Sequence, residues 1–245
     1  MSSIDELLQQ ISRRKHLADR DGPLIPLIAE TGGVNVMLAD SSALPEQLVD
    51  DVIHSAFNSA GQRCSALRVL YLQDEIADKV IKMLTGAMQT LQLGKPELAS
   101  TDIGPVIDAD AKSTLLAHLT KMHKSARLLA AVDSVPATGD FVAPHAFEIN
   151  SLAELPEEVF GPVLHIIRYQ SDQLQSVISD INENGYGFLS AYIAELTALR
   201  VTSLITRQLA IPISTETLLV RLLVSTHLVA MAYPAPGPRL VALII

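Results

Sequence analysis

The chain has 245 residues, a formal net charge of −9 and a single cysteine. An acidic chain without basic runs is a poor ligand for nucleic acid, so we expect no nucleic-acid partner. One cysteine excludes an internal disulfide and suits a reducing compartment. No uncharged apolar run is long enough to span a bilayer, and the first residues lack the features of a signal peptide. These features predict a cytoplasmic protein of one large domain or two small ones.

Helical and strand patterns alternate along most of the chain. The first helix is predicted from Ser3 to about Ala18, where Ser3 and Glu6 can form a capping box. Short strands and longer helices then follow one another, which predicts an α/β domain with a mostly parallel sheet. The predicted strands are 24–29, 34–38, 69–72, 128–132, 141–149 and 163–169. The predicted helices are 45–59, 74–91, one that begins at Asp108 or Asp110 and ends near 126, and 173–182.

The histidines do not form a metal-binding pattern. His118 and His123 are five residues apart on a predicted helix, which is poor spacing for two ligands on one face. We expect both to lie at the surface, His54 to be a surface or packed residue, and no metal site to be present.

The single cysteine, Cys64, lies in a predicted turn between a helix and a strand, where Gly61 permits a tight backbone turn. Cysteine reacts as the thiolate, which a neighbouring charge such as Arg63 or a nearby base would favour. Upstream, Glu30 ends an apolar strand and is followed, after Thr31, by two glycines; a half-buried carboxylate at such a position can act as a general base. A lone cysteine is more often a buried apolar residue, and such a Glu is more often a solvated turn residue. Neither feature therefore decides the function alone.

A third stretch, Glu157–Pro162, completes a pattern that resembles the aldehyde dehydrogenase superfamily. Residues 30–33 resemble its Glu-Leu-Gly-Gly motif, with Thr31 in place of Leu. Residues 61–64 resemble its nucleophile motif, and residues 157–162 its cofactor-ribose motif. The resemblance covers roughly residues 21–187. Several segments point to one member of the superfamily. They are similar to the glutamate-semialdehyde dehydrogenase module of bacterial bifunctional proline-utilisation flavoproteins, and they are residues 29–33, 40–47, 59–68, 102–108 and 141–144.

This resemblance implies a role for each site residue. Cys64 attacks the aldehyde carbon to give a thiohemiacetal, hydride transfer to NAD leaves a thioester, and Glu30 activates the water that hydrolyses it. The backbone N–H of Cys64 forms part of the oxyanion hole. Ser65 helps to bind the carboxylate end of glutamate semialdehyde. The implied cofactor-binding residues are Gly32, Glu158, which holds a ribose, and Phe160, which packs near the nicotinamide.

The sequence departs from the family at both ends. The family carries its main dinucleotide-binding domain ahead of the Glu30 motif, where this chain has an expected helix over 1–20, so most of the NAD site is expected to be missing. We expect a partial catalytic domain over 21–187. From Phe188 the sequence resembles nothing in the family, and we expect an irregular, poorly ordered tail over 188–245. Codons for 209–245 can be chosen so that a shifted frame spells a glycine-rich peptide like the family's C-terminal segment, so we interpret the tail as a frameshifted translation. The family's homodimer is expected, with its dimer strand lost.

Three hypotheses remain open from the sequence. The first is a fragment of an NAD-dependent glutamate γ-semialdehyde dehydrogenase, which is weakly active or inactive by itself. The second is a non-catalytic remnant that binds a partner or nothing. The third is an unrelated thiol enzyme, although no His stands near Cys64 in a matching motif.

Overall fold

The structure is a computed structural model that describes residues 33–183, 190–193 and 230–232. The chain divides into two units, residues 1–32 and 33–245, and every described residue belongs to the second unit. The predicted helix over 3–18, the predicted strand over 24–29, and the site residues Glu30 and Gly32 lie outside the described residues.

The described strands form one seven-stranded sheet in the order β3-β4-β5-β2-β1-β6-β7. The inner strands from β4 to β6 run parallel to one another, and β3 and β7 pair antiparallel at the two edges. The predicted α/β fold with a mostly parallel sheet is confirmed. The strands are β1 Val36–Ala39, β2 Val69–Gln73, β3 Arg127–Ala131, β4 His145–Glu148, β5 Val163–Tyr169, β6 Ser190–Ile193 and β7 Ala230–Ala232.

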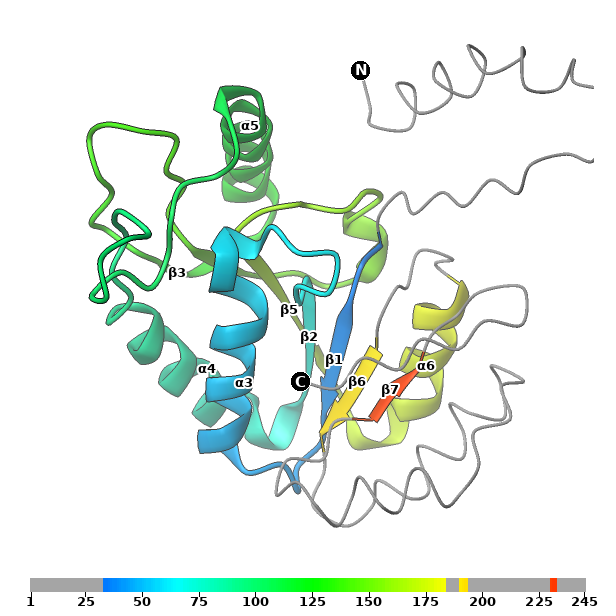
Figure 1. Cartoon of the computed structure of the whole chain (residues 1–245). Helices are drawn as coiled ribbons and strands as arrows, with labels where there is room; N and C mark the ends of the chain where they lie inside the picture. Colours follow the sequence, from blue (N-terminus) through cyan, green and yellow to red (C-terminus); the bar gives the residue numbers. More distant parts are fainter. Residues whose placement is uncertain (1–32, 184–189, 194–229, 233–245) are drawn as a thin grey trace, which may run out of the picture. The chain divides into compact units, whose positions relative to one another are not determined.

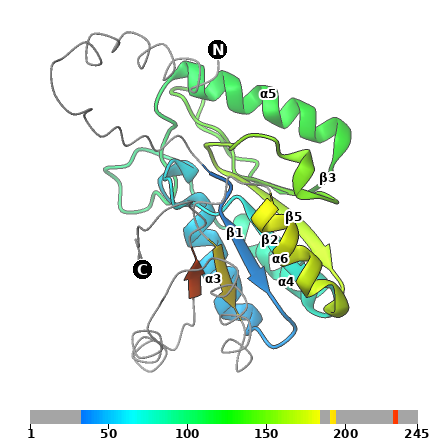
Figure 2. The ribbon, with the colours of Figure 1, turned by 90° about the vertical axis from the view of Figure 1, so that its right-hand side faces the viewer.

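Helices lie on both faces of the sheet (Figures 1 and 2). The chain moves in one direction across the sheet from β1 to β2, and it moves back in the other direction from β5 to β6. Right-handed crossovers therefore place α3 and α4, which contact each other, on the face opposite to α6. None of the described helices is long and apolar enough to cross a membrane. The helices are α3 Pro45–Phe57, α4 Asp74–Met88, α5 Ala109–Ser125 and α6 Leu174–Glu183, with 3₁₀ turns η1 Asn58–Gly61, η2 Leu152–Glu154 and η3 Ser171–Gln173.

The core lies between the central strands and the helices. Every residue of β1 and β2 is buried, and so are all residues of β5 except Arg168. Such near-continuous apolar runs are typical of parallel strands covered on both faces. The buried residues of α3 recur every three or four positions, so they lie on one face of the helix. Burying each large apolar side chain of this face contributes about 1.5–3 kcal/mol to the stability of the fold. The buried residues of that helix are Pro45, Leu48, Val49, Val52, Ala56 and Phe57.

Several elements differ in detail from their predictions. Asp108, and not Asp110, caps α5, because its side chain accepts a hydrogen bond from Ala111 N at 2.8 Å. β4 begins at His145, after a proline that has no N–H to donate to a ladder. His118 is half-buried rather than at the surface, while His54 and His123 are exposed. The short strands β6 and β7 fall in the segment after 187, for which the sequence pattern predicts no regular element.

Candidate active site

Gly33, the described residue of the first motif, meets the other two motifs because all three precede neighbouring strands of the sheet. Gly33 lies just before β1, Arg68 directly precedes β2, and the stretch from Glu158 leads into β5. β2 pairs in parallel with β1 on one side and with β5 on the other. Parallel neighbours have their amino ends at the same edge of the sheet, so segments as far apart as Gly33 and Glu158 meet there.

The nucleophile loop, which we define as residues 58–68, turns the chain sharply between α3 and β2. Three successive residues have left-handed backbone conformations, Ser59 (φ 56°), Ala60 (φ 53°) and Gly61 (φ 65°). For a residue other than glycine this conformation costs roughly 1–2 kcal/mol. The backbone N–H of Gln62 donates to Ser59 O at 3.0 Å and closes the turn. The loop then presents Cys64, whose side chain is a free, exposed thiol.

Gly61 is required here for a second reason, a close backbone contact with the third motif. A Cβ atom on Gly61 would lie 2.2 Å from Gly161 O. A Cβ atom on Gly161 would in turn lie 2.4 Å from a methyl carbon of Leu115 in α5. Gly61 therefore allows the nucleophile loop and the Glu157–Pro162 stretch to pack backbone against backbone, and Gly161 allows α5 to pack against that stretch.

Asn35 fixes the loop from the side of β1. Its side chain is buried, and its Nδ2 donates to Cys64 O at 2.6 Å and to Ala66 O at 2.8 Å. Its backbone oxygen accepts from the N–H groups of Arg68, at 3.0 Å, and Val69, at 3.1 Å. The backbone on both sides of the nucleophile is thus tied to the first strand.

Arg68 fixes the same loop from the side of β5. Its side chain is 1% exposed, and each of its five N–H groups has an acceptor. Nε and Nη2 donate to Glu158 Oε1 at 3.1 and 2.8 Å. Nη1 donates to Gly61 O at 2.7 Å and to Gly161 O at 3.2 Å. Nη2 also donates to Arg63 O at 3.2 Å. One buried guanidinium therefore joins the nucleophile loop to the third motif.

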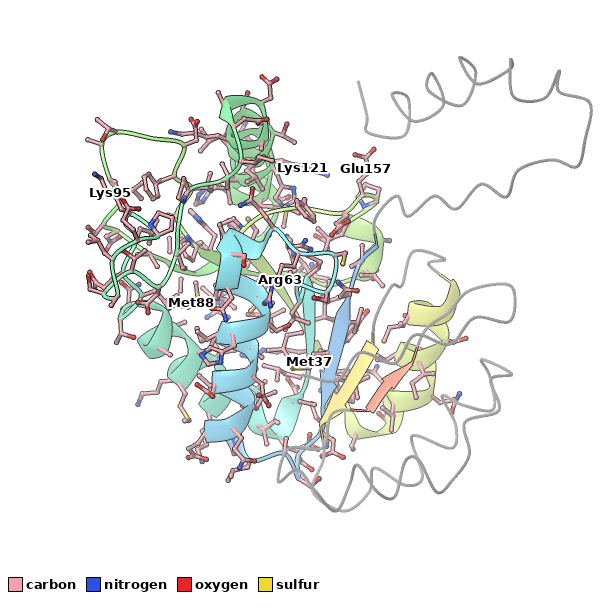
Figure 3. The ribbon with its side chains drawn as sticks, in the orientation of Figure 1. Met37, Arg63, Met88, Lys95, Lys121 and Glu157 are labelled. Carbon is pink, nitrogen blue, oxygen red and sulfur yellow. The ribbon has the colours of Figure 1, made fainter. Side chains whose placement is uncertain are left out.

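Glu158 is held from two directions. Besides Arg68, the backbone N–H of Gly33 donates to its Oε2 at 3.0 Å, so the last residue of the first motif also contacts the third. The Glu158 side chain is 14% exposed, whereas Glu157 is exposed and points outward (Figure 3). Phe160 is 46% exposed, and its ring centroid lies 5.2 Å from Arg68 Cζ. A carboxylate and an exposed aromatic ring thus flank the same guanidinium.

The other predicted site features lie as follows. Ser65 is partly exposed beside the nucleophile. The Arg63 side chain is turned to α3, where its Nη2 donates to His54 O at 3.0 Å. In the part of the chain that the structure describes, no three His, Cys, Asp or Glu residues are grouped to hold a metal ion. Sequence reasoning assigned no role to Asn35 or Arg68. The signal for Arg68 is a charged residue directly before a wholly buried strand.

Comparison with known proteins decides the family. The sequence model of the aldehyde dehydrogenase family matches residues 10–206. The chain belongs to the aldehyde dehydrogenase family. The resemblance predicted from the three motifs is thereby confirmed.

Several aldehyde dehydrogenase relatives are similar to this chain over about the same region. The bifunctional protein PutA of Escherichia coli (strain K12) is 55% identical over an alignment of 176 residues, and the match covers 69% of this chain and 13% of that protein. A 1-pyrroline-5-carboxylate dehydrogenase of Bacillus subtilis (strain 168) is 28% identical over 171 residues, which are 69% of this chain and 33% of that protein. The chain therefore spans only a small part of the PutA proteins that it matches.

Solved structures give the same result. A crystal structure of bifunctional proline utilization A (PutA) matches with a TM-score of 0.70 and 50% identity, covering 75% of this chain and 18% of that one. A methylmalonate-semialdehyde dehydrogenase from Oceanimonas doudoroffii matches with a TM-score of 0.64 and 27% identity, covering 70% of this chain and 37% of that one. The aldehyde dehydrogenase match extends beyond 21–187 at both ends. The domain boundaries and the frameshift interpretation of 188–245 stay predictions.

Proposed function

We propose that this chain carries the catalytic chemistry for NAD-dependent oxidation of L-glutamate γ-semialdehyde to glutamate, a step of proline catabolism. The names of its relatives, PutA and 1-pyrroline-5-carboxylate dehydrogenase, support this substrate. The observation that carries the proposal is the position of Glu158, which is hydrogen-bonded to Gly33 of the first motif and to Arg68 of the nucleophile loop.

The proposed chemistry begins at Cys64. Its thiolate adds to the aldehyde carbon, and the oxygen of the resulting thiohemiacetal is stabilised by the backbone N–H of Cys64. Asn35 supports this step, because its bonds to the carbonyls of Cys64 and Ala66 hold the peptide groups of the loop in place. NAD, when bound, supplies the hydride acceptor that allows the thiohemiacetal to become a thioester. Glu30 then takes a proton from water, which attacks the thioester and releases glutamate and the free thiol.

The described residues fit the cofactor at its ribose end. An ionised carboxylate has about four acceptor positions. The described donors use three at Glu158, two from Arg68 and one from Gly33. A position on Oε2 thus remains for a ribose hydroxyl, and the exposed ring of Phe160 is available to pack against a nicotinamide. The proposed contact of Gly32 falls outside the described residues.

Substrate binding, location and assembly complete the proposal. We propose that Ser65 binds the substrate's carboxylate end, because it is adjacent to the nucleophile and partly exposed. A cytoplasmic location is supported by the single cysteine, which suits a reducing compartment. The family's homodimer stays a prediction for this chain.

A single-turnover experiment tests the proposal. The purified 245-residue chain is mixed with L-glutamate γ-semialdehyde, with and without NAD, and the mass of the Cys64 peptide is measured after rapid quenching. We expect an acyl adduct on Cys64 that requires NAD and is absent in Cys64→Ala. In Glu30→Gln the adduct should persist longer, because hydrolysis loses its base. Steady-state NADH formation should be far below that of an intact relative.

Two results would contradict the proposal. A modification of Cys64 by the aldehyde that is equal with and without NAD would indicate an unrelated thiol enzyme. No modification under either condition, in a chain shown to be folded by circular dichroism, would indicate a non-catalytic remnant.

A further inference from the structure

We propose that Arg68 is a positioning residue that couples the carboxylate of Glu158 to the backbone of the nucleophile loop, so that a change at Glu158 alters the reactivity of Cys64. The proposal deepens the function proposed above and rests on it for its purpose. The coupling itself is a property of the described residues and is measurable without NAD or aldehyde.

The coupling follows from the shape of the guanidinium. Nη2 donates both to Glu158 Oε1, at 2.8 Å, and to Arg63 O, at 3.2 Å. Nη1 donates to Gly61 O at 2.7 Å. The group is planar and its donors have fixed directions. A displacement of the carboxylate must therefore either break its bonds to Arg68 or rotate the plane away from the two carbonyls that precede Cys64.

The backbone of Arg68 is held too firmly to absorb such a displacement. Its N–H donates to Asn35 O at 3.0 Å, within the junction with β1. Its carbonyl accepts from the backbone N–H of His165, at 2.9 Å, and from the Nδ1 of the same residue, at 3.1 Å. With the main chain fixed to strands on both sides, motion at the tip of the side chain is directed into the loop.

Electrostatics adds to the geometry. Burial lowers the pKa of Arg68, whereas the charge of Glu158 and that of a Cys64 thiolate raise it. The attraction between the guanidinium and the thiolate is reciprocal, and it depends on how much of the positive charge Glu158 compensates. A ligand hydroxyl on Glu158 would therefore affect the nucleophile through both position and charge.

A double-mutant cycle tests the coupling. The rate of Cys64 alkylation by iodoacetamide is measured at one pH near neutrality in the full 245-residue chain and in Arg68→Gln, Glu158→Gln and the double variant. We expect Arg68→Gln to slow alkylation about tenfold, because the loop that presents the thiol loses the buried donor that binds its carbonyls at Gly61 and Arg63. Glu158→Gln should change the rate about threefold or more when Arg68 is present, but hardly at all in the Arg68→Gln background.

Matched variants separate coupling from general damage. Arg127→Gln breaks an arginine–glutamate pair with a similar distance, 3.1 Å, but with the arginine 72% exposed, and it should leave the alkylation rate unchanged. Urea unfolding identifies which variants are folded. If Arg68→Gln does not fold, Arg68→Lys replaces it in the cycle, since lysine keeps the charge but lacks the fork. The same non-additivity is then expected with a smaller amplitude.

Additive rates in the cycle, or no effect of Glu158→Gln with Arg68 present, would overturn the coupling. Failure of the proposed function would look different. Non-additive alkylation rates without any NAD-dependent acylation of Cys64 would retain the coupling and reject the dehydrogenase chemistry. Additive alkylation rates together with NAD-dependent acylation of Cys64 would retain the dehydrogenase chemistry and reject the coupling.

Discussion

Two arginines at opposite edges of the same sheet show how differently the two regions are stabilised. Arg68 directly precedes β2, at the amino edge, and is 1% exposed. Arg168 lies near the end of β5, at the carboxyl edge, and is 26% exposed. The side chain of Arg68 donates three hydrogen bonds to backbone carbonyls and two to one carboxylate, that of Glu158. Arg168 instead meets three carboxylates, Asp78 at 2.6 Å, Glu148 at 3.0 Å and Asp74 at 3.5 Å.

The difference lies in what each arginine specifies. A carbonyl is part of the main chain, so a buried donor that binds several carbonyls fixes a backbone path. Surface carboxylates such as Asp78, which is 88% exposed, can move and be solvated. Removing one partner of a buried pair typically costs 3–5 kcal/mol, whereas exposed pairs contribute about 0–1 kcal/mol. The amino edge, which holds the candidate active site, is therefore expected to respond far more strongly to substitution.

The largest effect is expected from Arg68→Gln. The substitution leaves the carbonyls of Gly61 and Gly161 and the carboxylate of Glu158 without their buried donor. We expect the free energy of unfolding to fall by about 3–5 kcal/mol. Urea denaturation followed by circular dichroism measures this change. A loss below about 1 kcal/mol would show that the amino edge is no more dependent on its arginine than an exposed surface pair.

Gly61→Ala attacks the same edge through its backbone. The new Cβ would meet Gly161 O at 2.2 Å, in a backbone conformation with φ 65° that alanine rarely adopts. Strain and overpacking together should lower the free energy of unfolding by about 2–4 kcal/mol. Gly86→Ala in α4 is the matched control, because nothing lies within 4 Å of its new Cβ. That variant should be as stable as the parent or more so, since alanine favours helices. Equal effects of the two substitutions would contradict the prediction.

The comparison also shows what the sequence alone can and cannot provide. β5 was predicted with its observed bounds, and α3 nearly so, because their apolar residues follow the period of their structures. Local signals also placed Cys64 in a turn after Gly61. The role of Arg68 depends on which strands are neighbours, since Glu158 lies 90 residues away. No local pattern carries that information.

Two further features of the site left no signal in the sequence. Ser59 and Ala60 adopt left-handed conformations although glycine is the residue that usually does so, and neither residue type signals such a conformation in a sequence. The sequence predicts a surface position for His118, because its five-residue spacing from His123 is poor for a metal site. Its partner, His165, lies on β5, a strand that is distant in the sequence. For His118 a tertiary contact, which no local pattern predicts, decides the position.

An effect of intermediate size, the pH dependence of stability, is expected from the pair of His118 and His165. His165 Nδ1 donates to Arg68 O, so its Nε2 accepts from His118 Nε2 at 3.1 Å. Burial lowers the pKa of His165 to about 3 and that of His118 to about 4. Both side chains are therefore neutral when folded at pH 5, whereas in the unfolded chain they bind protons below about pH 6.5. Stability should be fully present above that pH and fall as the pH is lowered towards 4.

We expect the histidine pair to remove about 2–3 kcal/mol of stability between pH 7 and pH 5, after allowance for the partial exposure of His118. Urea unfolding at the two pH values measures the loss. His118→Gln keeps an N–H donor for His165 but does not titrate, so its loss over this interval should be smaller. An unchanged pH dependence in that variant would exclude His118 as a contributor.

The smallest effect is expected at the carboxyl edge, from Arg168→Gln. We expect a loss of less than about 1 kcal/mol in the free energy of unfolding at 0.15 M salt, because Asp74 and Asp78 are accessible to water and Glu148 keeps its pair with Arg127. The loss should nearly vanish at about 1 M salt, where exposed charges are screened, whereas the effect of Arg68→Gln should persist because buried pairs are screened much less. Urea unfolding of both variants at the two salt concentrations makes this comparison. If the loss for Arg168→Gln matched that for Arg68→Gln and resisted salt, the three carboxylates would be acting as a rigid network. The contrast between the two edges would then reflect the number of ionic partners and not burial.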